Sequence, residues 1–305
     1  MNYSIDSDKF ALKLNLVDGD IEIHGEERND IELELGDLRK NTAEEIFDIK
    51  FENNELTIIQ KDSKKLLKTF NVKDVDVVIK VPSGVKLSGE VKNVSGDISI
   101  HDIAGLVSGI STRNGDVQVV NVGDIDINVN IVNGDLKASN FIGAVKANNV
   151  NGDVSIAEGV YRQLGINNVN GDISISGEFD LEEDAKIKIV SGDISINSTK
   201  FTSGHKIYIN SVTGDNNITG DFPEDAIVQQ GGLKELKNLQ FLKDSIQPMI
   251  KQFKEHFKFM PHEKVKEEVN PRKNNEENIQ MILKMLSEGK INAEDAEKLI
   301  SALNK

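Results

Sequence analysis

The chain has 305 residues, with no cysteine and no tryptophan, and its 51 acidic against 36 basic residues give a formal net charge of -15. The acidic balance disfavours nucleic-acid binding, because a protein that neutralises phosphates needs a basic surface. The lack of cysteine excludes disulfides, thiolate metal sites and cysteine nucleophiles.

Residues 1–90 contain stretches in which apolar and polar residues alternate. These are VDGDIEI from Val17, DIELEL from Asp30, NELTII from Asn54 and DVDVVIKVP from Asp74. Alternation of this kind predicts β-strands with one buried face. Because only the first stretch carries a Gly-Asp step, and terminal repeats are often atypical, residues 1–90 are expected to form degenerate coils at the start of a repeat domain.

Residues 91–222 repeat one phrase, a small polar residue followed by Gly-Asp and an alternating apolar run. Its seven glycines are 19, 19, 18, 19, 21 and 22 residues apart. The positions five before, two after and four after each glycine are apolar, with Asn216 as the exception, and Phe141, Phe179, Phe201 and Phe222 recur at a looser corner. A period near 20 residues indicates stacked units, so the sequence predicts a parallel β-solenoid of 19–22-residue coils over residues 1–232. The alternative is a meander of hairpins, since Asn-Gly between alternating runs also favours tight turns; the nearly constant period favours the solenoid.

The Gly-Asp steps form the candidate site, a column of turns along the solenoid. Its members are Gly96, Asp97, Gly115, Asp116, Gly134, Asp135, Gly152, Asp153, Gly171, Asp172, Gly192, Asp193, Gly214 and Asp215. Glycine is expected here for a positive φ, and the polar residue before it for hydrogen bonding at the turn. Stacked aspartates would lie about 4.8 Å apart, where two like charges in water repel by about 1 kcal/mol. A structural role is therefore favoured, with weak cation binding and a carbohydrate or catalytic role as the alternatives.

The composition changes near residue 233. Residues 233–261 have apolar residues at helical spacing, which predicts an amphipathic region that caps the last coil; a partner-binding face and a membrane-interface helix are the alternatives. Residues 262–275 are predicted to be a linker and residues 276–305 a helical hairpin. The hairpin is too small to be stable alone, so Ile282, Leu286, Leu299 and Leu303 are expected to bind a protein partner or a second copy.

The predictions of localisation and enzymatic activity rest on the absence of targeting, membrane-spanning and catalytic motifs in the sequence. The polar, acidic start and the lack of an apolar run of about 18 residues predict a cytoplasmic protein, associated with a membrane only through a partner. The five histidines, His24, His101, His205, His256 and His262, are interpreted as scattered, and there is no nucleophile motif. The chain is therefore expected to be neither an enzyme nor a cofactor-binding protein.

The Gly-Asp copies, together with VPSGVKLSGEVKNVSGDISI from Val81 to Ile100, carry a family resemblance. The chain resembles the bacterial putative-adhesin family of β-strand-repeat domains of unknown function from about Lys9 to Asp221. MILKMLSEGKINAEDAEKLISAL, from Met281 to Leu303, resembles a short oligomerisation-type helical hairpin. The resemblance implies a right-handed parallel β-helix and a loose association with cell-envelope stress and phage-shock-type membrane proteins. It supplies no catalytic residue.

Overall fold

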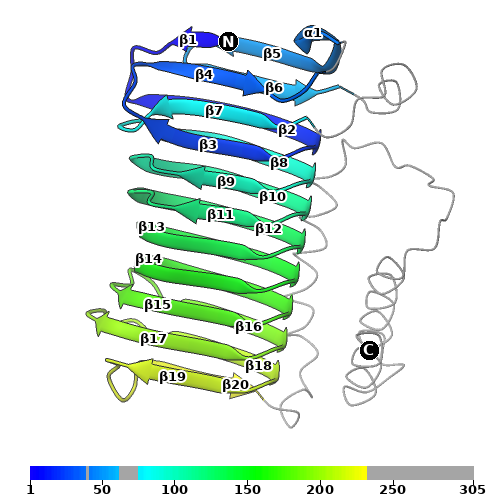
Figure 1. Ribbon diagram of the computed structural model, residues 1–305. Helices are drawn as coiled ribbons and strands as arrows, with labels where there is room; N and C mark the ends of the chain where they lie inside the picture. The colour runs from blue at the N-terminus through cyan, green and yellow to red at the C-terminus, as the bar shows by residue number, and fades with distance from the viewer. Residues whose placement is uncertain (39–40, 62–74, 232–305) are drawn as a thin grey trace, which may run out of the picture. The chain divides into compact units, whose positions relative to one another are not determined.

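The computed structural model describes residues 1–38, 41–61 and 75–231, and these build a β-solenoid (Figure 1). Met1–Gln229 form one compact unit. The predicted helices at 233–261 and 276–305, the linker at 262–275, and with them Ile282, Leu286, Leu299 and Leu303, lie outside the described residues.

Each regular coil has one strand before its Gly-Asp corner and one after it. The strands before the corner form side A: β2 (Lys9–Asp18), β8 (Lys86–Ser95), β10 (Gly105–Asn114), β12 (Asp124–Asn133), β16 (Ala185–Ser191) and β18 (Ile207–Thr213). Strand β20 (Ile227–Gly231) pairs with β18 and extends side A, but no Gly-Asp step follows it. The strands after it form side B: β3 (Ile21–Glu26), β9 (Ile98–His101), β11 (Val117–Val120), β15 (Ile173–Phe179), β17 (Ile194–Phe201) and β19 (Asn216–Gly220). Two longer strands, β13 (Leu136–Asn151) and β14 (Val154–Asn170), bend and contribute to both sides.

Neighbouring coils pair in parallel and in the register that the repeat predicts. On side A, Ile110 lies between Val91 and Val129, and on side B, Val117 lies between Ile98 and Leu136. Parallel pairing confirms the β-solenoid and shows that the hairpin meander is wrong, because hairpin strands pair antiparallel.

The apolar columns face a continuous core between the two sides. Ile173, Ile187 and Ile194, from successive strands, are all 0% exposed. Each such side chain contributes roughly 1.5–3 kcal/mol by leaving water, and its neighbours above and below share the same column. The core therefore runs along the solenoid from Phe10 to Ile209.

The first coil does not lie at the end of the stack. Strand β6 (Glu55–Gln60) pairs in parallel with one edge of β2, and β8 pairs with the other edge. In the same way β3 lies between β7 (Val77–Pro82) and β9. The chain thus makes the coil β2–β3, crosses to its far side for β6 and β7, and returns to continue with β8.

Antiparallel strands and one helical turn close the N-terminal end (Figure 1). Strand β1 (Asn2–Ser4) pairs with β4 (Asp30–Leu35), β4 pairs with β7, and β5 (Phe47–Glu52) pairs with β6. Helix α1 (Ala43–Ile46) precedes β5 and buries Ile46. The expectation of degenerate coils through residues 1–90 is therefore wrong for β1, β4 and β5, which form a lid; a solenoid end otherwise exposes its core and unpaired strand edges.

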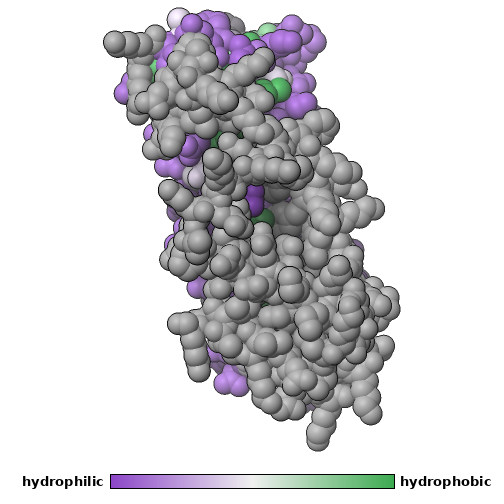
Figure 2. Space-filling model, turned by 90° about the vertical axis from the view of Figure 1, so that its right-hand side faces the viewer, coloured by the Kyte–Doolittle hydropathy of each residue, from purple (hydrophilic) through white to green (hydrophobic). Residues whose placement is uncertain are grey.

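The outer surface of this lid is polar. Figure 2 shows mainly hydrophilic residues where the described chain is visible at this end. Arg28 makes ion pairs with Glu26, Asp30 and Glu32, at 3.2, 2.9 and 2.9 Å. The lid thus covers the core with its apolar face and leaves charges outside.

Candidate functional site

The glycines of the Gly-Asp column have backbone conformations that other residues rarely adopt. Their φ angles lie between +110° at Gly214 and +150° at Gly115. A Cβ atom placed on Gly134 would lie 2.1 Å from the carbonyl oxygen of Gly115 in the preceding coil. Both the φ angle and the close approach of the coils thus require glycine at this corner.

The aspartates of the column are linked by hydrogen bonds from coil to coil. The backbone N–H of each aspartate donates to the carboxylate Oδ1 of the aspartate before it in the stack, and the ladder starts from Asp76. The donor–acceptor pairs are Asp20 to Asp76 at 2.9 Å, and, each at 2.8 Å, Asp97 to Asp20, Asp116 to Asp97, Asp135 to Asp116, Asp153 to Asp135, Asp172 to Asp153, Asp193 to Asp172 and Asp215 to Asp193. Hydrogen bonds to a charged acceptor are the stronger ones, and they offset the repulsion between stacked carboxylates.

Asparagines beside the column form a second ladder. The side-chain amide of Asn133 donates to Asn114, that of Asn151 to Asn133 and that of Asn170 to Asn151, at 2.9–3.0 Å. Inside the corner, the amide of the buried Asn168 donates to the carbonyl oxygens of Gly152 and Gly171. The side-chain amides at the corner thus donate hydrogen bonds within and between coils, whereas Oδ1 of Asn168 and of Asn170 is buried without a hydrogen-bond partner.

The aromatic residues of the looser corner also stack. Tyr161 lies between Phe141 and Phe179, with ring centroids 5.7 and 4.9 Å away, and Phe201 and Phe222 continue the series beyond Phe179. The hydroxyl of Tyr161 donates to the carbonyl oxygens of Ser176 and Ile156, at 2.7 and 3.2 Å. Burial raises the pKa of this phenol well above its ordinary value.

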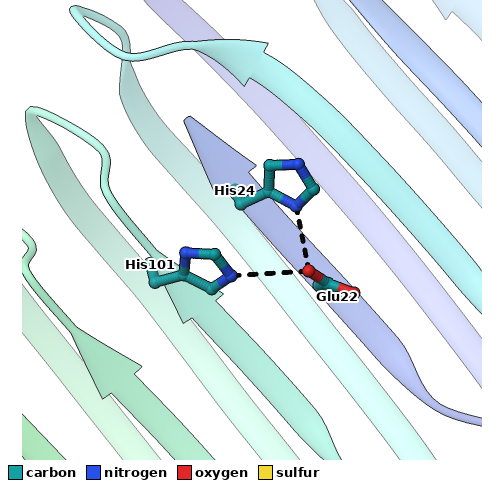
Figure 3. Close-up of side chains that lie close together, drawn as sticks. All are labelled: Glu22, His24 and His101. Carbon is teal, nitrogen blue, oxygen red and sulfur yellow. Dashed lines mark ion pairs between the residues drawn. The ribbon is translucent and has the colours of Figure 1, made fainter. Parts of the chain in front are cut away.

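Two histidines lie side by side on side B, near the lid (Figure 3). His24 lies on the outward face of β3, and the parallel pairing of β3 with β9 places His101 directly opposite it. Their rings stack with centroids 5.2 Å apart and planes 13° apart. The interpretation of the histidines as scattered is therefore wrong for this pair.

A carboxylate joins the two rings. Oε1 of Glu22 lies 3.1 Å from Nδ1 of His24 and 3.5 Å from Nε2 of His101 (Figure 3). Glu22, His24 and His101 each offer one potential metal-ligating atom, and these three atoms all lie within 4.8 Å of one another. Among the described residues, they form the group of three or more such side chains that meets this limit. Within those same ranges the aspartate column does not form such a group, and weak cation binding there stays a prediction.

Further carboxylates contact the outer nitrogens of both rings. Nε2 of His24 lies 2.9 Å from Oε1 of Glu26, and Nδ1 of His101 lies 2.7 Å from Oδ2 of Asp102. The hydrogen bond with His24 lowers the pKa of Glu26, and the hydrogen bond with His101 lowers the pKa of Asp102. The amide of Asn121 also donates to Asp102, at 3.0 Å.

The sequence carries a signal for this pair. His24 and His101 each stand five residues after the glycine of a Gly-Asp step, in GDIEIH and GDISIH. Equal distance from the corner places them in one column. Their contact also requires the two coils to be neighbours, although β4, β5, β6 and β7 come between them along the chain.

Among the helices of the described residues, none combines the length and the apolarity of a membrane span.

The described chain is a parallel β-solenoid protein with ladders of polar residues at its corners and a histidine–carboxylate cluster near its lid. A family model described as Toastrack DUF4097 matches residues 10–238, and the chain belongs to that family. A second model, described as a SHOCT-like domain, matches residues 277–305.

Solved structures that match the chain include two proteins named putative adhesins. The one from Parabacteroides distasonis has 16% identity and a TM-score of 0.34, covering 76% of this chain and 94% of its own. The one from Parabacteroides merdae has 16% identity and a TM-score of 0.28, with the same coverage. A putative cell adhesion protein from Clostridium sporogenes has 13% identity and a TM-score of 0.27, covering 72% of this chain and 98% of its own. No curated protein matches the chain.

Proposed function

We propose that this protein is a non-enzymatic interaction scaffold of the bacterial cell-envelope stress response. In this proposal the solenoid offers a rigid binding face. The C-terminal segment attaches the protein to a partner protein, for example a membrane protein, or to a second copy of the chain. The match to a SHOCT-like domain at residues 277–305 supports a separate assembly element at that end. The link to envelope stress rests on the family resemblance of the Gly-Asp repeats.

The observation that carries the proposal is a straight row of polar residues along side B. The row contains one residue from each successive coil in direct register: Ser99, Gln118, Lys137, Ser155, Ser174 and Ser195. Parallel strands are spaced about 4.8 Å apart, so the row presents polar side chains at a regular interval on a surface that the core holds rigid. A rigid surface loses little conformational entropy on binding, which favours a macromolecular partner over a small substrate.

The test compares what co-purifies from detergent-solubilised membranes with the wild-type full-length chain and with four variants of it. Leu286→Asp with Leu299→Asp disrupts the predicted partner-binding stripe, and Lys284→Asp introduces the same residue beside that stripe as its control. Ser174→Arg alters the side B row, and Ser88→Arg on side A is the matched control. We expect one set of proteins to be retained by the wild type and both controls, and to be lost from the two test variants.

Fractionation of cells distinguishes the alternative, a surface-exposed adhesin or glycan-binding module. The scaffold proposal predicts the intact chain in the cytoplasmic or membrane fraction. Recovery on the cell surface, together with glycan binding that Ser174→Arg abolishes, would favour the adhesin. An identical set of co-purifying proteins from every variant would contradict the scaffold.

A further inference from the structure

The cluster of Glu22, His24 and His101 has donor atoms at the separations that a small metal ion needs. With metal–ligand bonds of about 2.0–2.1 Å, two ligands of a tetrahedral ion lie about 3.3 Å apart. The distances from Glu22 Oε1 to His24 Nδ1 and His101 Nε2 are 3.1 and 3.5 Å. Figure 3 shows both ring nitrogens directed toward the same carboxylate.

The inner nitrogen of His24 lacks a hydrogen-bond partner. Nδ1 of this ring is buried, and it neither accepts nor donates a hydrogen bond. When Nε2 carries the proton that is shared with Glu26, Nδ1 has an unpaired lone pair and lies 3.1 Å from Oε1 of Glu22. Two electron-rich atoms at this distance repel each other unless a cation lies between them, and either a second proton or a metal ion can supply that charge.

The surroundings match the outer shell of metal-bound histidines. A ligating histidine usually donates its other N–H to a carboxylate or a carbonyl, which orients the ring and raises the basicity of the ligating nitrogen. Glu26 holds this position for His24, and Asp102 holds it for His101. Glu26 is itself paired with Arg28, and Asp102 with Asn121.

The lysine on the strand beside His24 is paired with carboxylates outside the cluster. Lys80 is the register neighbour of His24 on β7. Its amine contacts Glu34 at 2.6 Å and Glu32 at 3.9 Å. A positive charge that could compete with a metal ion is thus held by other carboxylates.

From these contacts we propose that Glu22, His24 and His101 bind a divalent transition-metal ion of the Zn²⁺ type. Two imidazoles and one carboxylate suit Zn²⁺, Ni²⁺ or Cu²⁺, whereas Mg²⁺ and Ca²⁺ prefer oxygen ligands alone. Glu22 is 46% exposed, so the fourth position is open to water. The ion would join β3 to β9 and so fasten the first coil to the coil that follows it in space.

In the experiment the full-length chain is first treated with a chelator and then titrated with Zn²⁺. Calorimetry measures the binding, and thermal unfolding measures the change in Tm. We expect one Zn²⁺ to bind through these side chains. At a free Zn²⁺ concentration of about a hundred times Kd, the Tm should rise by about 5 °C. The double variant His24→Gln and His101→Gln should lose that binding and that rise. Asp102→Asn should weaken the affinity by about tenfold or more, because it removes the carboxylate behind His101.

Controls separate this site from other histidines and from misfolding. His205→Gln removes a half-exposed histidine that pairs with Asp184 elsewhere on the solenoid, and should bind as the wild type does. Each variant is also melted in chelator, where an unchanged Tm shows that it folds; if the double variant melts early, Glu22→Gln takes its place. Mg²⁺ at the same concentrations should have no effect. Wild-type affinity retained in a folded double variant or in Glu22→Gln, or no Zn²⁺-dependent change in the wild type, would overturn the proposal.

Discussion

The carboxylate Oδ1 of Asp172 accepts a hydrogen bond from the backbone N–H of Asp193 at 2.8 Å. The same bond recurs along the whole column, so one side chain in each coil satisfies the backbone of the next. Beside it, Ile173 points into the core and is 0% exposed. Two adjacent residues of one repeat thus serve different purposes, and substitutions should separate them.

Ile173→Asp should be severely destabilising, by about 4 kcal/mol or more, because it buries an unpaired charge between two coils. Asp172→Asn should cost under about 1 kcal/mol, since the amide oxygen can still accept the N–H of Asp193. Chemical denaturation of both variants measures the difference. Equal stabilities would show that Ile173 does not face the core.

Gly134→Ala should destabilise the solenoid by roughly 2–4 kcal/mol, because the corner requires a positive φ and leaves no room for a Cβ atom. The matched control is Gly109→Ala on β10, where a Cβ atom would meet nothing within 4 Å. Thermal melts should rank the control close to the wild type. A Gly134→Ala melt as high as the control would contradict a strict glycine requirement.

Tyr161→Phe should cost about 1–2 kcal/mol at neutral pH, because two carbonyl oxygens lose their donor. The folded pKa of Tyr161 is raised above its unfolded value of about 10, so its contribution is present below that pH and is lost as the pH rises above it. Stability measured between pH 8 and pH 11 should therefore fall more steeply for the wild type than for the variant. Parallel curves would exclude a buried phenol at this position.

Calcium at millimolar concentration should leave the Tm unchanged, because the aspartate carboxylates already accept backbone hydrogen bonds and calcium needs six to eight converging oxygens. Thermal melts with and without calcium test this. A rise of several degrees that disappears in the triple variant of Asp135, Asp153 and Asp172 to Asn would instead establish a cation-binding column.

The repeat itself was readable because its information is local. The side-chain period of a strand is two, so the residues on either side of each Gly-Asp step show which positions face inward, and Ile98 and Val117 accordingly stack in the core. The spacing of the glycines likewise fixes the perimeter of each coil and hence the register of its neighbours.

The lid and the histidine pair depended on the order in which coils stack. A parallel strand offers the same hydrogen bonds at either edge, so nothing in the local pattern of β2 and β3 shows that β6 and β7 would occupy one edge and β8 and β9 the other. In the folded chain β4 pairs with β7 and β5 with β6, so the lid covers the edge that β6 and β7 occupy. His24 and His101 share a place in the repeat through their sequence, but they touch only because the tertiary structure makes their coils neighbours.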